Sequence, residues 1–247
     1  MRRISLFLLV LLFGVGCFSG TVMEPAYGTN YYDQDFECVQ GLVPQESDKK
    51  YLTRRLTYMA ALPQVAPNSH TIITGESTAA LFTPERLQTY LPGKNISNRA
   101  IPGETTVVFL SALDELVIKS RPRTIILAIG GNDLLGGRCI GTIVQNTELI
   151  LKTIHQKLPA ARVLLLSVPP VVSWKVSSVA GYLNLGFQQL SDRLGYVQYV
   201  DLWPYLADEK RPMLAEKYRQ VYKGKVDQVH FNEEGYKQFA EALKPYL

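Results

Sequence analysis

The chain has 247 residues, of which 47% are hydrophobic and 19% carry a charge, and its formal net charge at pH 7 is +4. A chain of this length suits one domain with a single hydrophobic core. The balance of apolar and charged residues excludes an intrinsically disordered protein.

The N-terminus has the pattern of a secretory signal. Arg2 and Arg3 precede an apolar run from Ile4 to Val15, and the run is shorter than the roughly 20 apolar residues of a membrane-spanning helix. Residues 1–16 are therefore predicted to be a signal peptide of an exported protein. Its removal leaves 24 basic and 22 acidic residues, a net charge of +2, which argues against a nucleic-acid partner.

The end of the apolar run resembles the cleavage box of bacterial lipoproteins. Cys17 stands where the lipidated cysteine would be, although Gly14 occupies a position that usually holds a larger apolar residue. We expect Cys17 to carry the lipid, residues 17–45 to serve as tether and lead-in, and the protein to be anchored to a membrane of the cell envelope. The alternative is ordinary signal cleavage near Ser19, which would give a soluble periplasmic or secreted protein.

Two cysteines remain after Cys17, namely Cys38 and Cys139. An exported protein is exposed to oxidising conditions, so these two are expected to form one disulfide bond. The alternative is a pair of unrelated thiols, because the sequence does not show whether their backbones approach closely enough.

The folded domain is predicted to span residues 46–247. An amphipathic segment at residues 46–62 is expected to lie across a sheet whose strands begin after His70. Short β-branched runs then alternate with longer segments of helical periodicity, which predicts βαβ units and a parallel sheet. The predicted strands are Thr71–Thr74, Ile96–Ile101, Thr124–Ile129, Arg162–Val168 and Val197–Asp201.

The helical segments carry apolar stripes and capping signals. One stripe comprises Ile143, Thr147, Ile150, Leu151, Ile154 and Leu158. Thr83 before a proline and Asn232 before two glutamates are predicted helix N-caps. Right-handed crossovers between five strands give an α/β fold, a three-layer α/β/α sandwich, in which ligands bind at the carboxyl ends of the strands.

The first predicted strand ends in a glycine turn, Gly75-Glu76-Ser77, which places a serine at the ligand-binding edge of the sheet. A serine in such a turn is commonly a helix cap, so this position alone does not establish a nucleophile.

Two further clusters end strands at the same edge. Gly130-Gly131-Asn132-Asp133 follows the third strand, and the amide of Asn132 is a group that can stabilise an oxyanion. Gly103, after the second strand, would let a backbone N–H approach a ligand closely. Each also has a simpler interpretation, as a glycine turn with Asn or Asp supporting the local backbone.

Asp227 and His230 stand three residues apart before the last helix. An aspartate can hold an imidazole in the tautomer that accepts a proton from serine. His155 lies within a predicted helix and His70 precedes a strand, so only His230 is predicted to sit in a loop with a carboxylate nearby. A surface ion pair is the alternative.

These four clusters, taken in order, resemble the SGNH (GDSL-type) hydrolases over Thr71 to Leu247. The resemblance implies a flavodoxin-like five-stranded sheet and a serine esterase that needs no metal or cofactor. It also implies Ser77, Asp227 and His230 as the catalytic triad, and an oxyanion hole formed by Ser77, Gly103 and Asn132. Relatives often carry an asparagine after the fourth strand, for which Asn184 is the counterpart here.

The chain departs from the family pattern at two positions, where Glu76 replaces the usual aspartate and Thr78 the usual leucine. We expect these changes to alter the packing of the turn rather than to supply a catalytic group. The acyl or leaving-group pocket is predicted to involve a loop over residues 169–181, with Trp174, and the segment around Trp203.

The substrate is predicted to be a short acyl, for example acetyl, ester of a glycan or lipid. The alternatives on this fold are a lysophospholipase, a thioesterase and an acyltransferase. An alternative of another class is an inert binding module of the cell envelope that has kept the fold.

Overall fold

The computed structural model describes Arg55, Tyr58, Met59 and residues 70–247. The predicted signal peptide, the lipidation site Cys17 and the lead-in over residues 17–45 lie outside these residues, as do Cys38 and most of the 46–62 segment. Within the described part of the chain, no helix is both long and apolar enough to cross a bilayer.

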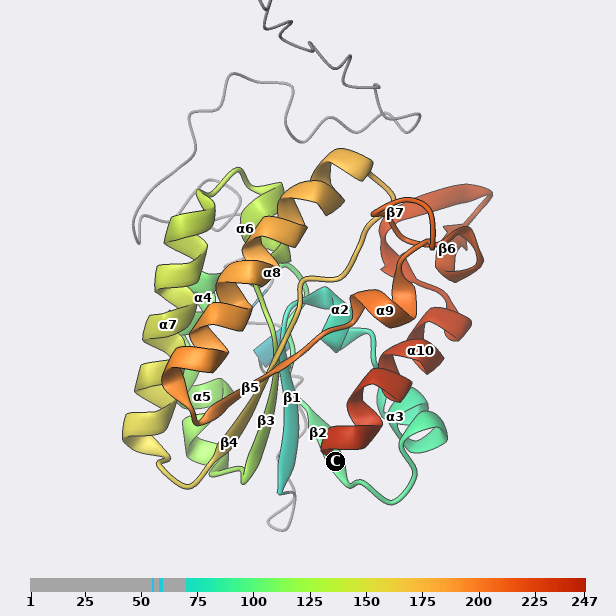
Figure 1. The fold of residues 1–247 in the computed structure, drawn as a ribbon. Helices are drawn as coiled ribbons and strands as arrows, with labels where there is room; N and C mark the ends of the chain where they lie inside the picture. The colour runs from blue at the N-terminus through green and yellow to red at the C-terminus, as the bar shows by residue number, and fades with distance from the viewer. Residues whose placement is uncertain (1–54, 56–57, 60–69) are drawn as a thin grey trace, which may run out of the picture.

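Five parallel strands form a central sheet in the order β2-β1-β3-β4-β5 (Figure 1). They are β1 (Thr71–Gly75), β2 (Ile96–Asn98), β3 (Thr124–Ala128), β4 (Arg162–Leu166) and β5 (Val197–Val200). This is the flavodoxin-like order. The predicted fold class and the five predicted strands are therefore confirmed.

Strand β2 ends at Asn98, three residues earlier than predicted, because the side chain of Asn98 bends the chain. Its Oδ1 accepts a hydrogen bond from the Ala100 N–H at 2.9 Å. Its Nδ2 donates to the carbonyl oxygens of Ala79 at 2.7 Å and Phe82 at 2.9 Å, which ties β2 to the segment after the site serine.

The inner strands β1, β3 and β4 bury alternate side chains in two separate cores, because successive residues of a strand point to opposite faces. In β3, Ile125 and Leu127 belong to one core, and Ile126 and Ala128 to the other. The first core is completed mainly by α4 (Thr106–Ser111), α5 (Leu113–Leu116), α7 (Ile140–Lys157) and α8 (Trp174–Leu194). The second is completed mainly by α2 (Ser77–Ala80), α3 (Pro84–Tyr90), α9 (Trp203–Leu206) and α10 (Glu233–Leu243). Figure 1 shows the resulting three layers.

The predicted helix signals are confirmed. The Thr83 side chain accepts from the Arg86 N–H at 3.4 Å at the start of α3. The Asn232 side chain accepts from the Gly235 N–H at 3.0 Å at the start of α10. On α7 the predicted stripe is buried from Ile143 to Ile154.

Four short elements and a hairpin complete the described fold. They are α6 (Gly131–Leu135), η1 (Ile118–Ser120), η2 (Glu216–Tyr218), η3 (Lys244–Tyr246) and the antiparallel pair β6 (Arg219–Tyr222) and β7 (Lys225–Phe231). Cys139, directly before α7, is disulfide-bonded. Its predicted partner Cys38 lies outside the described residues, so this pairing stays a prediction.

Candidate active site

The site serine stands on a turn that only glycine permits. Gly75, the last residue of β1, has a φ of +114°, and a Cβ added there would lie 1.7 Å from the carbonyl oxygen of Ala128. The next residue, Glu76, donates its N–H to that same oxygen at 2.8 Å. Ser77 then begins α2, whose N-cap is Glu76 and not Ser77. The hydroxyl of Ser77 is thus not used as a helix cap.

Asp227 and His230 belong to a bulged strand, so the prediction that they lie in a loop is wrong. In the β6–β7 pair, Val221 faces Val226 and Arg219 faces Phe231. The four residues between the paired positions of β7 therefore stand opposite a single residue of β6. Such a bulge bends a strand and redirects its side chains.

The bulge is shaped by the carboxylate of Asp227. Its Oδ1 accepts hydrogen bonds from the backbone N–H groups of Val229 at 2.8 Å and His230 at 3.0 Å. The carbonyl of Gln228 in turn accepts from the Val172 N–H at 3.0 Å, which joins the bulge to the loop after β4. These contacts fix the direction in which the His230 ring leaves the strand.

The three side chains predicted as a triad form one hydrogen-bonded row. Asp227 Oδ2 lies 2.9 Å from His230 Nδ1, and His230 Nε2 lies 2.8 Å from Ser77 Oγ. Partial burial would raise the pKa of Asp227, but the hydrogen bonds from His230 and Val229 outweigh it and hold this pKa below its usual value. Asp227 is therefore ionised near neutral pH and oriented to keep a proton on Nδ1 of the imidazole.

Asn132, in α6, lies beside Ser77 in the same pocket. Its side-chain Nδ2 donates to the carbonyl oxygen of Glu104 at 3.0 Å and approaches Glu76 Oε2 at 3.3 Å. Gly103, the residue before Glu104, is buried in the loop between β2 and α4 with a φ of +81°. The structure thus brings Asn132 to the serine. Gly103 adjoins Glu104, whose carbonyl oxygen holds the Asn132 amide.

The carboxyl group of Glu76 has a pKa well above that of an ordinary glutamate. Its side chain is buried, and burial raises its pKa to about 7. Hydrogen bonds from the backbone N–H groups of Asn132 and Gly131 oppose this rise, and the negative charge of Asp133 adds to it. The expectation that Glu76 affects only the packing of the turn is incomplete, because its carboxyl group reaches the amide of Asn132.

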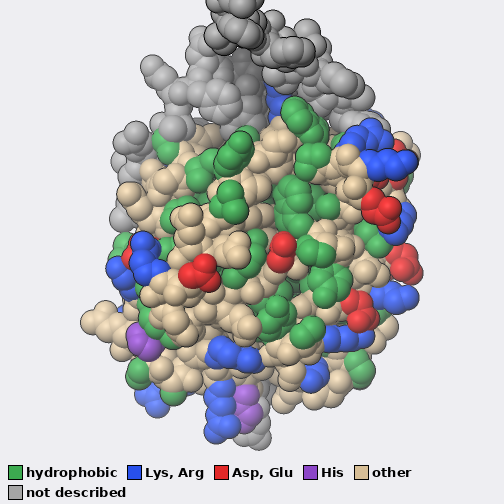
Figure 2. Space-filling model, in the orientation of Figure 1, with side chains coloured by type: hydrophobic (Ala, Val, Ile, Leu, Met, Phe, Trp, Pro, Cys, Tyr) green, Lys and Arg blue, Asp and Glu red, His purple; other side chains and the backbone are tan. Residues whose placement is uncertain are grey.

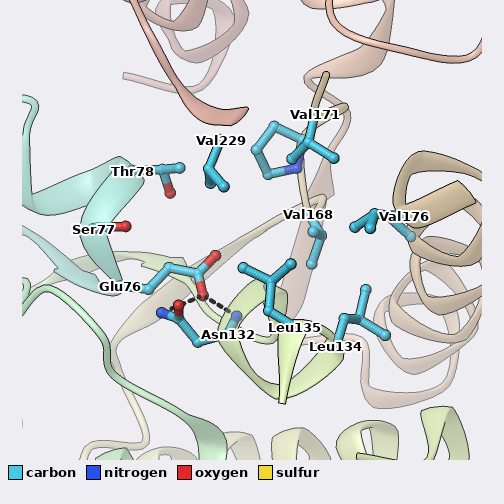
Figure 3. Close-up of a pocket in the computed structure, with 13 residues that line it drawn as sticks. Glu76, Ser77, Thr78, Asn132, Leu134, Leu135, Val168, Val171, Val176 and Val229 are labelled. Atoms are coloured by element: carbon cyan, nitrogen blue, oxygen red, sulfur yellow. Dashed lines mark hydrogen bonds between the residues drawn. The ribbon is translucent and has the colours of Figure 1, made fainter. Parts of the chain in front are cut away.

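A narrow apolar pocket opens beside Ser77 (Figure 3). Its empty space amounts to about 390 Å³, with the open mouth included. Its polar residues are Glu76, Ser77, Thr78 and Asn132, and Gly131 adds backbone. Its apolar residues are Leu134, Leu135, Val168, Pro169, Val171, Val176, Ala180 and Val229. The pocket therefore offers an aliphatic wall to a group attached at the serine.

The predicted tryptophans do not line this pocket, and the predicted loop over residues 169–181 is too long. α8 begins at Trp174, because the Ser173 side chain accepts from the Val176 N–H at 3.4 Å and caps the helix. Trp203 instead donates its Nε1–H to the carbonyl oxygen of Val168 at 2.9 Å. It therefore supports the backbone of a pocket residue rather than the pocket surface.

Hydrophobic side chains are exposed on the face shown in Figure 2. They gather in the upper middle of this view, whereas most lysines and arginines lie nearer its edges and some acidic side chains lie near the centre. The most exposed large apolar residues are Tyr182 on α8, at 68%, and Tyr222 on β6, at 67%. Among the described residues, no group of three His, Cys, Asp or Glu side chains is placed to hold a metal ion.

Comparison with known families identifies the chain. A family model for GDSL-like lipases and acylhydrolases matches residues 65–238. The chain belongs to the GDSL-like lipase/acylhydrolase family. It is accordingly an acylhydrolase of the esterase class, and the predicted family is confirmed. No curated protein sequence matches the chain.

Solved structures of other bacterial proteins share the fold. A Streptococcus pneumoniae protein provisionally described as a platelet activating factor is 24% identical, with 80% of this chain and 92% of that chain covered and a TM-score of 0.69. A GDSL-like lipase from Bacteroides thetaiotaomicron is 19% identical, with 80% and 95% covered and a TM-score of 0.59. An acetylxylan esterase from Geobacillus stearothermophilus is 12% identical, with 73% and 95% covered and a TM-score of 0.56.

The sequence did not indicate the buried polar network that joins the segment after β3 to the start of α4. Asp133 accepts from the backbone N–H of Thr106 at 2.8 Å and from its hydroxyl at 2.6 Å, and it pairs with Arg138 at 2.8 Å. Asn146 donates to the Thr106 hydroxyl at 2.9 Å. Asp133 thus binds the start of α4, a contact that the simpler interpretation as a local turn residue did not include.

A second ion pair supports the same region. Arg55 pairs with Glu104 at 2.8 Å, and both side chains are almost fully buried. Because the carbonyl oxygen of Glu104 accepts from Asn132 Nδ2, this pair helps to position the amide. No sequence motif marks Arg55, since an arginine in an amphipathic segment is ordinarily exposed to solvent.

Proposed function

We propose that this acylhydrolase cleaves short acyl esters of a glycan or lipid through a covalent acyl-enzyme, with Ser77 as nucleophile, His230 as general base and acid, and Asp227 as the group that orients His230. The observation that carries the proposal is the row from Asp227 through His230 to Ser77, with separations of 2.9 and 2.8 Å. Nucleophile, base and orienting carboxylate within hydrogen-bond reach are what acyl transfer from a serine requires.

The reaction would proceed in two halves. Ser77 Oγ attacks the carbonyl carbon while its proton passes to His230 Nε2, and a tetrahedral oxyanion forms. The bond to the leaving oxygen then breaks, and His230 protonates the departing alcohol. In the second half, His230 removes a proton from water, the resulting hydroxide attacks the acyl-enzyme, and the proton returns to Ser77 as the carboxylic acid leaves.

We assign the oxyanion to the backbone N–H groups of Ser77 and Gly103 and to the side-chain amide of Asn132. The Asn132 contact with Glu104 supports this assignment, because an amide held by its neighbours loses little freedom when it binds the transition state. Removing one such donor typically costs about 3 kcal/mol of transition-state stabilisation.

The pocket favours a short acyl group. The space beside Ser77 is small, about 390 Å³ even with the open mouth included, and its wall is largely aliphatic. Val176 and Ala180 from α8 line it, and Figure 3 shows Val176 across the pocket from Ser77. We therefore place the acyl chain against these residues and the alcohol part of the substrate toward solvent.

The test begins with Ser77→Ala and a nitrophenyl acetate. The variant should fold and lose turnover, and labelling of the wild-type protein by a fluorophosphonate should disappear in it. Ser191→Ala is the matched control, because Ser191 lies on α8 with its hydroxyl bonded to the Val197 carbonyl oxygen at 2.9 Å. Undiminished hydrolysis by Ser77→Ala would reject the proposal, and unlabelled wild-type protein would favour an inert binding module.

The substrate class is tested by a panel of acetylated xylose oligomers, lysophospholipids, acyl thioesters and nitrophenyl esters of graded chain length. Acetylated xylan is included because an acetylxylan esterase shares this fold. The proposal expects the highest kcat/KM for acetyl or propionyl esters. Preference for long acyl chains would favour a lysophospholipase or thioesterase, and acyl transfer to a glycan in preference to water would favour an acyltransferase.

We also propose that the enzyme is exported and anchored by a lipid on Cys17. The apolar run after Arg2 and Arg3 and the Gly-Cys pair at residues 16–17 support this. Expression in bacteria with labelled palmitate should give a labelled membrane protein, and Cys17→Ser should lose the label. An unlabelled wild-type protein with an N-terminus near Ser19 would instead indicate ordinary signal cleavage.

A further inference from the structure

Among the residues that the structure describes, Glu76 is the one whose carboxyl group reaches both the Ser77 pocket and the proposed oxyanion amide. Its Oε2 accepts from the backbone N–H of Asn132 at 3.1 Å and lies 3.3 Å from the side-chain Nδ2 of the same residue. Figure 3 shows the carboxyl group between Asn132 and the aliphatic wall, with its other oxygen toward the pocket. The Glu76 side chain packs tightly against Gly131, since a Cβ added to Gly131 would lie 2.7 Å from Glu76 Oε1.

The Asn132 amide has only two hydrogens to donate. One bond goes to the Glu104 carbonyl oxygen at 3.0 Å, and the other goes to Glu76 Oε2 at 3.3 Å. The bond to Glu76 is the longer and weaker of the two, so an oxyanion at Ser77 would most readily take the hydrogen that Glu76 holds. How strongly Glu76 holds it depends on its charge, because a carboxylate accepts roughly twice as strongly as a neutral acid.

The negative charge of an ionised Glu76 would also disfavour the oxyanion directly. The oxyanion would form within a few ångströms of Glu76, in a poorly solvated pocket where like charges repel strongly. An ionised Glu76 would then oppose the negative charge that develops during attack. A neutral Glu76 would not.

Hydrogen bonds from the backbone N–H groups of Asn132 and Gly131 favour the ionised form of Glu76, but the charged groups around it do not. From α6 it faces Asp133, whose charge is compensated by Arg138. Glu104, on the α4 side, is compensated by Arg55. Across the pocket, β7 contributes Asp227 and His230, which are bonded to each other.

No lysine or arginine in the described part of the chain pairs with Glu76. Burial accordingly raises the pKa of Glu76 to about 7, which is within the range in which an esterase works.

We propose that Glu76 is a positioning residue that controls ester hydrolysis through its own proton. The neutral acid releases the second hydrogen of the Asn132 amide to the oxyanion, and the carboxylate withholds it. This inference rests on the proposed function. It gives the replacement of aspartate by glutamate in the turn a consequence for the reaction, since the extra methylene carries the carboxyl group to Asn132.

The test is the pH dependence of kcat and KM for a nitrophenyl acetate from pH 5 to 10, with the hydrolysis seen in Ser77→Ala subtracted at each pH. Wild-type kcat should be low at acid pH, because a protonated imidazole cannot accept the serine proton. It should fall again above neutrality, by about tenfold for each pH unit beyond the titration of Glu76. KM should change little, because the amide binds the transition state rather than the substrate.

The matched variant is Glu76→Gln, which keeps the shape of the side chain and cannot ionise. It should lose the alkaline fall and keep the acid rise, so that at pH 9 its kcat exceeds that of the wild type by about tenfold or more. Glu76→Asp, which restores the common family residue, shortens the reach to Asn132 and should weaken the alkaline fall. Circular dichroism of each variant checks that it is folded.

A wild-type kcat that stays level from pH 7 to 10 would overturn the inference, whether or not the variants fold. An alkaline fall that persists unchanged in folded Glu76→Gln would do the same. These results differ from failure of the proposed function, in which Ser77→Ala itself remains active.

Discussion

Asn184 satisfies both backbone hydrogen-bonding groups of Val168. Its Oδ1 accepts from the Val168 N–H at 2.8 Å, and its Nδ2 donates to the Val168 carbonyl oxygen at 2.9 Å. Val168 lines the pocket just after β4, whereas Asn184 lies in the middle of α8. One buried amide therefore fixes the wall of the pocket to the helix that covers the sheet.

Asn184→Ala should weaken both the fold and the pocket. The Val168 N–H would be left buried without a partner, which typically costs about 1 to 3 kcal/mol. A less fixed wall should also raise KM severalfold with a smaller change in kcat. Urea unfolding and steady-state kinetics measure the two effects. Leu185→Ala, at an exposed position next to it, is the control, and equal behaviour of the two variants would contradict this role.

Asp227→Asn should reduce kcat by about a thousandfold to ten-thousandfold while leaving a folded protein. An amide oxygen can still accept the N–H groups of Val229 and His230, but its –NH₂ would face His230 Nδ1 and stabilise the wrong tautomer. Circular dichroism and kinetics on a nitrophenyl acetate test this. A loss of less than tenfold would remove Asp227 from the mechanism.

The same variant should show a characteristic pH dependence of stability. Because the pKa of Asp227 is lowered in the folded state, its ionised form stabilises the protein above its unfolded pKa of about 4, and this contribution is lost as the pH falls through the folded value. The difference in free energy of unfolding between wild type and Asp227→Asn should therefore shrink on acidification. Urea unfolding at pH 7 and pH 3 gives the comparison.

The sequence predicted the sheet because buried parallel strands are apolar at nearly every position, as in β3 and β4. It predicted Ser77, Gly103 and Asn132 as neighbours because the carboxyl ends of parallel strands share one edge. The β6–β7 hairpin was missed because its strands are short, partly exposed and interrupted by the bulge at Asp227. No periodic pattern marks such a segment.

The remaining errors concern contacts rather than elements. A tryptophan near a site predicts an aromatic wall, yet the indole of Trp203 binds the backbone of Val168. The role of Glu76 depends on how far one side chain reaches across the turn, which spacing along the chain does not reveal. The pairing of Arg55 with Glu104 joins segments 49 residues apart and has no local signature either.

Gly75→Ala should prevent or severely impair folding. The new Cβ would lie 1.7 Å from the Ala128 carbonyl oxygen, and the backbone φ of +114° is one that alanine rarely adopts. Relieving this clash would require β1 and β3 to separate near Ser77. Gly141→Ala is the control, because a Cβ there meets nothing within 4 Å in helix α7. Its stability should equal or exceed that of the wild type, and a soluble, active Gly75→Ala would contradict the close approach.

Val176→Ala should shift the acyl preference toward longer chains. Val176 is buried on the pocket wall, and its two methyl groups occupy space that a longer acyl chain would need. One methylene in an apolar pocket changes discrimination by about tenfold or more. The ratio of kcat/KM for butyryl over acetyl nitrophenyl esters should rise by at least severalfold. An unchanged ratio would place the acyl group elsewhere, and Val179→Ala, outside the pocket lining, serves as the comparison.

Glu76→Gln should stabilise the protein increasingly as the pH rises. Because the folded pKa of about 7 lies above the unfolded value near 4.5, the wild type loses stability between these two pH values as the buried acid is forced to ionise. Glutamine carries no charge and pays no such penalty. The difference in free energy of unfolding should grow from pH 4.5 and level off above pH 7, after a gain of up to about 3 kcal/mol. Urea unfolding across this range measures it, with Leu185→Ala, a change at an exposed uncharged residue, as the reference. A constant difference would mean that Glu76 titrates as an ordinary exposed acid.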